Sequence, residues 1–264
     1  MAVLRVFSYL PNPRLYKATI AARFSGAEIE ILGDKPPKLV NWLWDYDARE
    51  LADGDKEALS NFGREAVMGF TGVKLYKTDA FLDAHPFGNV PAGFVEDGQV
   101  GVFESNSILR AAARAGTQPN SLLGASLADQ SRVDSFLDRS LVFARDLQRY
   151  LLAGDDMNAA LHKEMASEVL TFAAGLDRAL QSGPYLVGDS ITLADIGAVC
   201  DLCQLTYERG HAERFEQLRL GFLVPTLRPY THLGAYLSRL ADDPRFSEDL
   251  ERYFKTLLPV FDAH

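Results

Sequence analysis

Cysteine is scarce in this chain: only Cys200 and Cys203 occur among its 264 residues. Two cysteines do not make a disulfide framework. Their Cys-x-x-Cys spacing falls inside a predicted helix, whereas reactive pairs lie at a helix start, where a thiolate is stabilised. We interpret both as buried apolar residues without redox chemistry. The five histidines show no metal-ligand spacing, so no metal site is predicted.

Long apolar runs and excess positive charge are also missing. No run approaches the roughly 20 residues that span a bilayer, and the N-terminus lacks the pattern of a secretory signal. The net charge of −9 argues against nucleic acid and anionic membranes as partners, because both are negatively charged. We therefore expect a cytoplasmic globular protein with one large domain or two modest ones.

The residues that point to a binding function lie at 87–92 and 102–108. Proline readily takes a cis bond, and a cis Val90–Pro91 bond would turn the backbone groups of Val90 toward a visiting peptide. The helix predicted after Glu104 offers unpaired amide donors to a carboxylate. Glu104 itself supplies a negative charge for an ammonium group. Together these features predict a site for a small zwitterionic peptide.

The segments Asn89-Val90-Pro91 and Glu104-Ser105-Asn106 resemble the glutathione site of the glutathione transferases. The wider match is closest to the transferase-like N-terminal domain of the gamma subunit of translation elongation factor 1B. Residues 14–18, 20–22, 185–188 and 191–196 also carry it. The glutathione-binding residues that the resemblance implies are Arg14, Asn89, Val90, Pro91, Glu104 and Ser105.

The resemblance implies a thioredoxin-like α/β domain at 1–117 and an all-helical domain at 126–264. It also implies conjugation of reduced glutathione, as co-substrate, to a small hydrophobic electrophile, as in detoxification. The family usually forms homodimers through the helical domain. Between about 33 and 77 the chain departs from the family pattern, and we expect an inserted loop with one helix there.

By resemblance, Val90 would pair its backbone with the cysteinyl unit of glutathione, and Glu104 with Ser105 would hold the γ-glutamyl unit. In this family the loop after the first strand carries the residue that activates the thiol. The hydroxyl donors there are Tyr9 and Ser8, and a donor that stabilises a thiolate makes a better nucleophile at neutral pH. Alternatively, Tyr9 packs at a domain junction and Ser8 caps a turn.

Two other functions compete with glutathione transfer. One is a non-catalytic scaffold, because the gamma subunit that this chain resembles uses its corresponding domain in that way. The other is a different glutathione-dependent reaction, by a lyase, isomerase or dehalogenase. The chain ends near the end of the helical domain, which favours the enzyme interpretation. The insertion would be either a lid or wall of the second-substrate pocket or a surface decoration that mediates a protein contact. Trp42 and Trp44 favour a packed or partner-binding role over disorder.

Local signals predict several helix boundaries. Asn12 followed by proline starts a helix that Gly26 ends. Two long helices, at 129–152 and 158–180, should pair as an antiparallel hairpin. Thr192 and Asp195 have the spacing of a capping box, so we interpret Asp195 as structural rather than catalytic.

Overall fold

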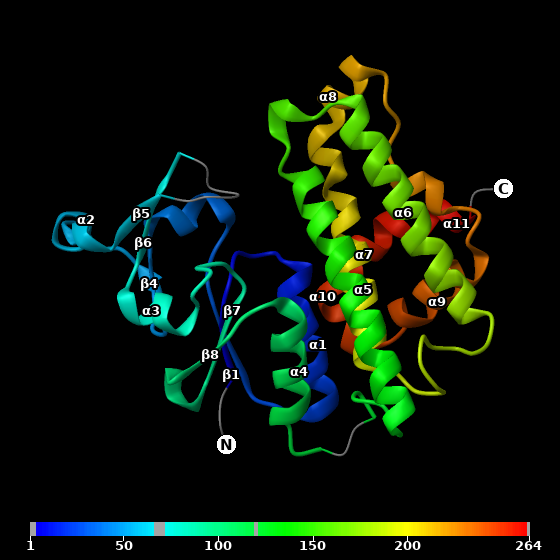
Figure 1. Cartoon of the computed structure of the whole chain (residues 1–264), viewed down its shortest axis with the longest axis horizontal. Coiled ribbons are helices and arrows are strands. Elements are labelled where there is room, and N and C mark those ends of the chain that lie inside the picture. Colours follow the sequence, from blue (N-terminus) through cyan, green and yellow to red (C-terminus); the bar gives the residue numbers. More distant parts are fainter. Residues whose placement is uncertain (1–3, 66–71, 119–120, 263–264) are drawn as a thin grey trace. The chain divides into compact units, whose positions relative to one another are not determined.

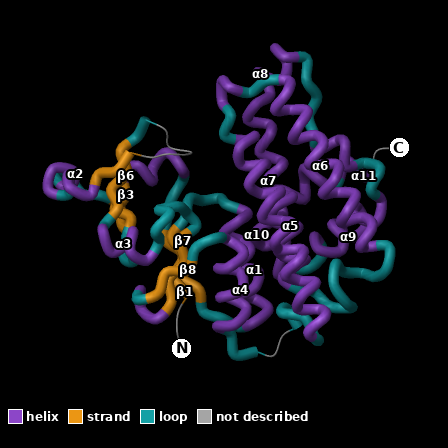
Figure 2. Tube along the Cα trace, viewed as in Figure 1, coloured by secondary structure: helices purple, strands orange, loops and turns teal. Residues whose placement is uncertain are grey.

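The computed structural model describes residues 4–65, 72–118 and 121–262 (Figure 1). The chain divides into two compact units, residues 1–119 and 120–264. Every strand that the structure describes lies in the first unit, and the second unit is helical (Figure 2). An α/β unit followed by a helical unit is the order that the sequence predicts.

The main sheet of the first unit has four strands in the order β2-β1-β7-β8. These are β1 (Leu4–Phe7), β2 (Ile29–Leu32), β7 (Ala92–Val95) and β8 (Val100–Val102). Strand β1 runs parallel to β2 and antiparallel to β7, which pairs antiparallel with β8. The register places Phe7 opposite Ala92, so the end of β1 lies beside the residue that follows Pro91.

Helix α1 (Pro13–Ser25) begins and ends where the sequence predicts. The Asn12 side chain accepts a hydrogen bond from the Arg14 amide, and Pro13 occupies the first turn, where no intrahelical donor is lost. Gly26 closes the helix with a left-handed φ of 70°. The boundaries therefore follow from neighbouring residues alone.

Helix α4 (Ser105–Ala115) packs against α1 within the first unit. Ile108, Leu109 and Ala112 are buried, and their spacing puts them on one face of the helix. At the end of α1, the Ser25 hydroxyl donates to the Ala112 carbonyl at 2.9 Å. These contacts hold α4 against α1.

The predicted loop with one helix at 33–77 is wrong for most of that segment. It does contain one short helix, α2 (Asp55–Ala58), but it also supplies a second sheet in the order β4-β3-β6-β5. The strands are β3 (Trp42–Trp44), β4 (Arg49–Glu50), β5 (Gly63–Glu65) and β6 (Lys74–Lys77). Strands shorter than the usual length of about five residues show no readable alternation. Residues 66–71 lie outside the described part of the chain.

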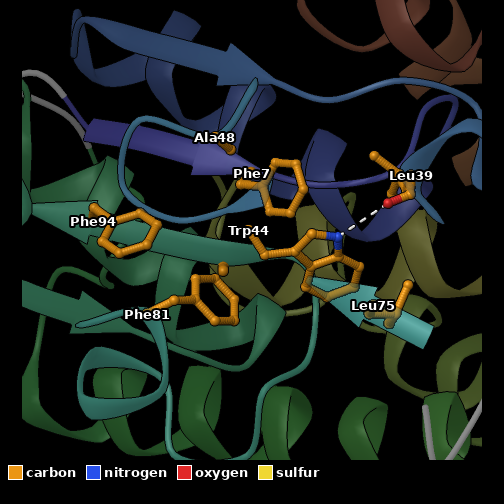
Figure 3. Packing of buried hydrophobic residues seen from close by; sticks show 8 residues of the cluster. Phe7, Leu39, Trp44, Ala48, Leu75, Phe81 and Phe94 are labelled. Atoms are coloured by element: carbon orange, nitrogen blue, oxygen red, sulfur yellow. Dashed lines mark hydrogen bonds between the residues drawn. The ribbon is translucent and has the colours of Figure 1, made fainter. Parts of the chain in front are cut away.

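The two sheets share one hydrophobic core, drawn in Figure 3. We call it the shared core; its buried members are Phe7, Leu39, Trp44, Ala48, Leu75, Phe81, Ala92 and Phe94. The Trp44 ring lies 5.3 Å from Phe7 and 5.9 Å from Phe81, which belongs to helix α3 (Asp79–Ala84). Its indole N–H donates to the Leu39 carbonyl at 3.2 Å. The sheet β4-β3-β6-β5, which we call the inserted sheet after the expected insertion at 33–77, is therefore part of the core of the first unit.

The second unit is built from helices. They are α5 (Leu127–Leu151), α6 (Ala159–Leu180), α7 (Leu193–Gln204), α8 (Ala212–Leu218), α9 (Thr231–Ala241), α10 (Pro244–Leu257) and α11 (Pro259–Asp262). Helix α5 packs against α6 and against α7. In the described part of the chain, no helix combines the length and the apolar character that crossing a membrane requires.

Helix α7 begins with the predicted capping box of Thr192 and Asp195. The buried Asp195 carboxylate accepts hydrogen bonds from the Thr192 amide at 2.8 Å and the Thr192 hydroxyl at 2.9 Å. It also accepts from the Leu186 amide and the Tyr236 hydroxyl, each at 3.0 Å. The carboxylate joins three segments of the helical unit, which gives Asp195 a structural role.

Candidate functional site

The loop that leads into β7 carries Asn89, Val90 and Pro91. The Val90–Pro91 bond is cis, as the sequence predicts. Val90 is partly buried against the shared core, whereas Asn89 is exposed and makes no side-chain hydrogen bond to another described residue. The loop thus presents Asn89 at the surface and holds Val90 against the core.

Gly88 determines the path of this loop. Its φ of 59° lies in the left-handed region, which glycine adopts without steric cost. Its amide donates to the His85 carbonyl at 2.8 Å, and its carbonyl accepts from the Lys77 ammonium at 2.8 Å. Lys77 is the last residue of β6, so the inserted sheet contacts the loop directly.

His85 precedes the loop and is only 1% exposed. Its ring stacks on Phe81 at 5.2 Å and meets Phe94 edge-on at 4.6 Å. Burial lowers the pKa of His85 to about 4, because the charged imidazolium loses hydration. At neutral pH His85 is therefore an uncharged part of the aromatic packing and supplies no cation to the site.

The start of α4 is the second part of the candidate site. Glu104 is exposed and has a φ of 67°, and its carbonyl accepts from the amides of Ser107 at 2.9 Å and Ile108 at 3.0 Å. The Glu104 side chain makes no capping hydrogen bond, so its carboxylate is available to a ligand's ammonium group. Ser105 is the first helical residue and is 6% exposed.

Lys17 is a site residue that the sequence reasoning missed. It is fully buried in α1, and its ammonium donates to the Asn106 side-chain oxygen at 2.8 Å and to Ser105 Oγ at 3.4 Å. A cation beside the positive end of a helix favours binding of an anion there. A signal was present, because Lys17 shares a helical face with the buried Ile20 and Ala21.

Ser8 and Tyr9 follow β1 and differ in accessibility. Ser8 is fully buried, its hydroxyl accepts a hydrogen bond from the Asn12 side chain at 3.0 Å, and its amide donates to the Leu32 carbonyl at 3.0 Å. Tyr9 is partly buried and packs against the shared core. Tyr9 is therefore the more accessible of the two hydroxyl donors.

Tyr9, Val90 and Trp42 each pack against the shared core. Trp42 comes from the inserted sheet and stacks on Phe7 with ring centres 6.0 Å apart. The insertion thus contributes residues to the core against which Tyr9 and Val90 pack. Arg14 is partly buried, and its amide serves the cap of α1.

Close packing connects the loop to the start of α4. A Cβ atom on Gly93, in β7, would lie 3.1 Å from a side-chain carbon of Ile108, so the absence of a side chain lets α4 approach the sheet. The first unit therefore combines a positively charged helix start, an exposed carboxylate and a cis-proline loop. This combination suits a short peptide with a free carboxylate and a free ammonium group.

No family model matches the chain. Probable elongation factor 1-gamma 1 of Arabidopsis thaliana is 29% identical over 257 residues, which cover 94% of this chain and 49% of that protein. Elongation factor 1-gamma 3 of Oryza sativa subsp. japonica is 35% identical over 217 residues, which cover 77% of this chain and 43% of that protein. The chain spans about half the length of these curated relatives.

Among solved structures, glutathione S-transferase isozyme E7 of Drosophila melanogaster matches with a TM-score of 0.61. The match covers 98% of this chain and 96% of that chain at 15% identity, which is evidence for the fold alone. The predicted fold class, a thioredoxin-like unit followed by a helical unit of the transferase type, is confirmed. These comparisons also confirm the predicted resemblance to the glutathione transferases and to the gamma subunit of the elongation factor.

Proposed function

We propose that this chain, which has the glutathione S-transferase fold and is similar in sequence to elongation factor 1-gamma, is a glutathione-binding scaffold module. The observation that carries the proposal is the extent of the sequence match. It covers 94% of the chain, and the matched relative is named an elongation factor rather than a transferase. The partners that we propose are proteins of the translation elongation machinery.

The ligand that we propose is reduced glutathione. The Lys17 ammonium and the amides at the start of α4 suit the carboxylate of its γ-glutamyl unit, beside Ser105. The exposed Glu104 carboxylate suits the ammonium group of the same unit. The Val90 backbone, two residues before the start of β7, suits the cysteinyl unit, because an extended peptide can pair with a strand end.

Conjugation of glutathione to a small electrophile is the second candidate function, and the position of Tyr9 favours it. Tyr9 packs against the shared core, as does Val90, beside which the proposed cysteinyl unit would lie. A hydroxyl donor near the sulfur would lower the thiol pKa below its usual value of about 8.5. For either function we propose a cytoplasmic homodimer. Light scattering of the purified protein tests the dimeric state.

Calorimetric titration with reduced glutathione tests the proposed ligand. We expect binding at one site per chain and weaker binding by the Glu104→Ala and Ser105→Ala variants, with unfolding midpoints close to that of the unmutated protein. Thr171→Ala, on an exposed position of α6, is the control. Absence of heat at millimolar glutathione would refute the ligand assignment.

Turnover with chlorodinitrobenzene, a general electrophile for glutathione, separates the two candidates. If the chain is a scaffold, the unmutated protein and the Tyr9→Phe variant should give the same low rate. If it is a transferase, the variant should be slower than the unmutated protein, and the pKa of its bound thiol should be higher. Partner binding is measured by mass spectrometry of proteins that co-purify with the tagged chain from its own cells. Elongation factor subunits no more abundant than in a tagged control would contradict the scaffold function.

A further inference from the structure

Lys77 is the contact between the inserted sheet and the loop that leads to Val90. Its ammonium donates a 2.8 Å hydrogen bond to the Gly88 carbonyl. The same nitrogen lies 4.8 Å from the centre of the Trp44 ring, close enough for a cation–π contact. Because Trp44 is buried and hydrogen-bonded to the Leu39 carbonyl, it gives Lys77 a rigid support.

The Lys77 ammonium is not paired with a carboxylate of the described residues: none of their carboxylate oxygens lies within 4.0 Å of its nitrogen. Lys77 is half-buried, and the lost hydration lowers its pKa from the usual 10.5. A methionine would occupy the same space without this cost. The distinctive property of lysine here is therefore its donor group, which reaches the Gly88 carbonyl.

Gly88 is suited to this contact. A Cβ atom there would lie 3.2 Å from the Lys77 nitrogen and 3.3 Å from a methyl carbon of Leu82. The Gly88 amide is held by the His85 carbonyl, and its carbonyl is held by Lys77. With both backbone groups bonded, the chain enters the Val90–Pro91 segment from a fixed position.

We propose that Lys77 is a positioning residue of the candidate glutathione site, which acts by holding the Gly88 carbonyl and, through it, the Val90 backbone. The ligand in this statement rests on the proposed function, whereas the holding of the loop does not. The inserted sheet then forms a working part of the site, and not a surface decoration. Without the ammonium, Gly88 keeps only the bond from its amide to His85.

Hydrogen–deuterium exchange of the free protein tests the holding of the loop. In Lys77→Met, a peptide covering residues 88–92 should exchange about fivefold faster, because a hydrogen bond from a charged donor is lost. Lys77→Arg keeps a cationic donor and should restore slow exchange. Lys74→Met changes an exposed lysine at the other end of the same strand and should leave this peptide unchanged. Equal exchange in Lys77→Met and the unmutated protein overturns the proposal.

Calorimetry with reduced glutathione tests the consequence for binding. We expect the Kd of Lys77→Met to rise about tenfold with a melting temperature within about 2 °C of the unmutated protein, and Lys77→Arg to recover most of the affinity. An unchanged Kd in Lys77→Met overturns the positioning role while leaving the proposed function intact. If the unmutated protein binds no glutathione, the proposed function fails, and the exchange experiment alone decides whether Lys77 holds the loop.

Discussion

Replacement of Asp195 by alanine should lower the free energy of unfolding of the helical unit by about 4 kcal/mol. The buried carboxylate accepts hydrogen bonds from the amide and hydroxyl of Thr192, the Leu186 amide and the Tyr236 hydroxyl. Alanine removes this acceptor from the Thr192 and Leu186 donors, and each buried donor without an acceptor costs about 1–3 kcal/mol. The Tyr236 hydroxyl keeps a 3.4 Å hydrogen bond to the backbone carbonyl of residue 195. The effect should therefore be far larger than that of an ordinary surface substitution.

Two effects keep the loss below the sum of the individual costs. Burial raises the pKa of the Asp195 carboxyl, since the ionised form is desolvated, and alanine removes that penalty. The donors also share one small region, so a single relaxation can satisfy more than one of them. A loss of about 3–5 kcal/mol remains, which is a large part of the roughly 5–15 kcal/mol that stabilises a domain.

Urea unfolding followed by circular dichroism at neutral pH measures this loss. Asp242→Ala is the matched control, because Asp242 is exposed in the same unit, and its stability should change by no more than about 0.5 kcal/mol. Asp195→Asn keeps one acceptor oxygen and should fall between the two. A loss below about 1 kcal/mol in Asp195→Ala would refute the reasoning. Unchanged stability combined with lost glutathione binding would also refute it, because Asp195 would then act in a ligand site.

Acidification should destabilise the first unit through His85. The folded pKa of about 4 lies below the unfolded value of 6.5, so this contribution is complete above pH 6.5 and is lost as the pH falls toward 4. The loss amounts to about 3 kcal/mol. Urea unfolding at about pH 7 and about pH 4.5 measures it, and the unfolding free energy of His85→Leu should depend less on pH than that of the unmutated protein. The same pH dependence in both proteins would contradict this. Gly101→Ala places a Cβ atom 2.1 Å from the Ala84 carbonyl oxygen and should cost more than about 2 kcal/mol. Gly175→Ala, in open space on α6, should instead add up to about 1 kcal/mol, and similar thermal shifts in the two variants would exclude the clash.

Sequence reasoning succeeded where a structure depends on adjacent residues. Asn12 and Gly26 bound α1, and Thr192 pairs with Asp195, because each of these signals acts within one helical turn. The inserted sheet was missed for the opposite reason. Strand β3 pairs with β6 across a long stretch of chain, and neither strand is long enough to show alternation.

The candidate site also has features that adjacent residues predict and features that depend on residues far apart in the sequence. The cis bond before Pro91 and the buried Ser105 at the start of α4 follow from a short motif. Lys17 and Lys77 do not, since lysine is among the residues least often buried, and only the approach of α4 and of the Gly88 loop gives them their partners. Helical spacing places Lys17 on a buried face, but the partners of both cations come from tertiary packing, which composition and spacing do not reveal.

The shared core has a consequence for how the chain can vary. Because Trp44 packs between Phe7 and Phe81, the two sheets should unfold in one cooperative transition. A chain shortened across 36–77 would lose Trp44 and leave the rings of Phe7 and Phe81 facing water, and a large exposed apolar patch promotes aggregation. Length changes that a surface loop tolerates are therefore costly here: the segment can vary at its exposed positions, such as Lys56 and Glu57, but it cannot be lost.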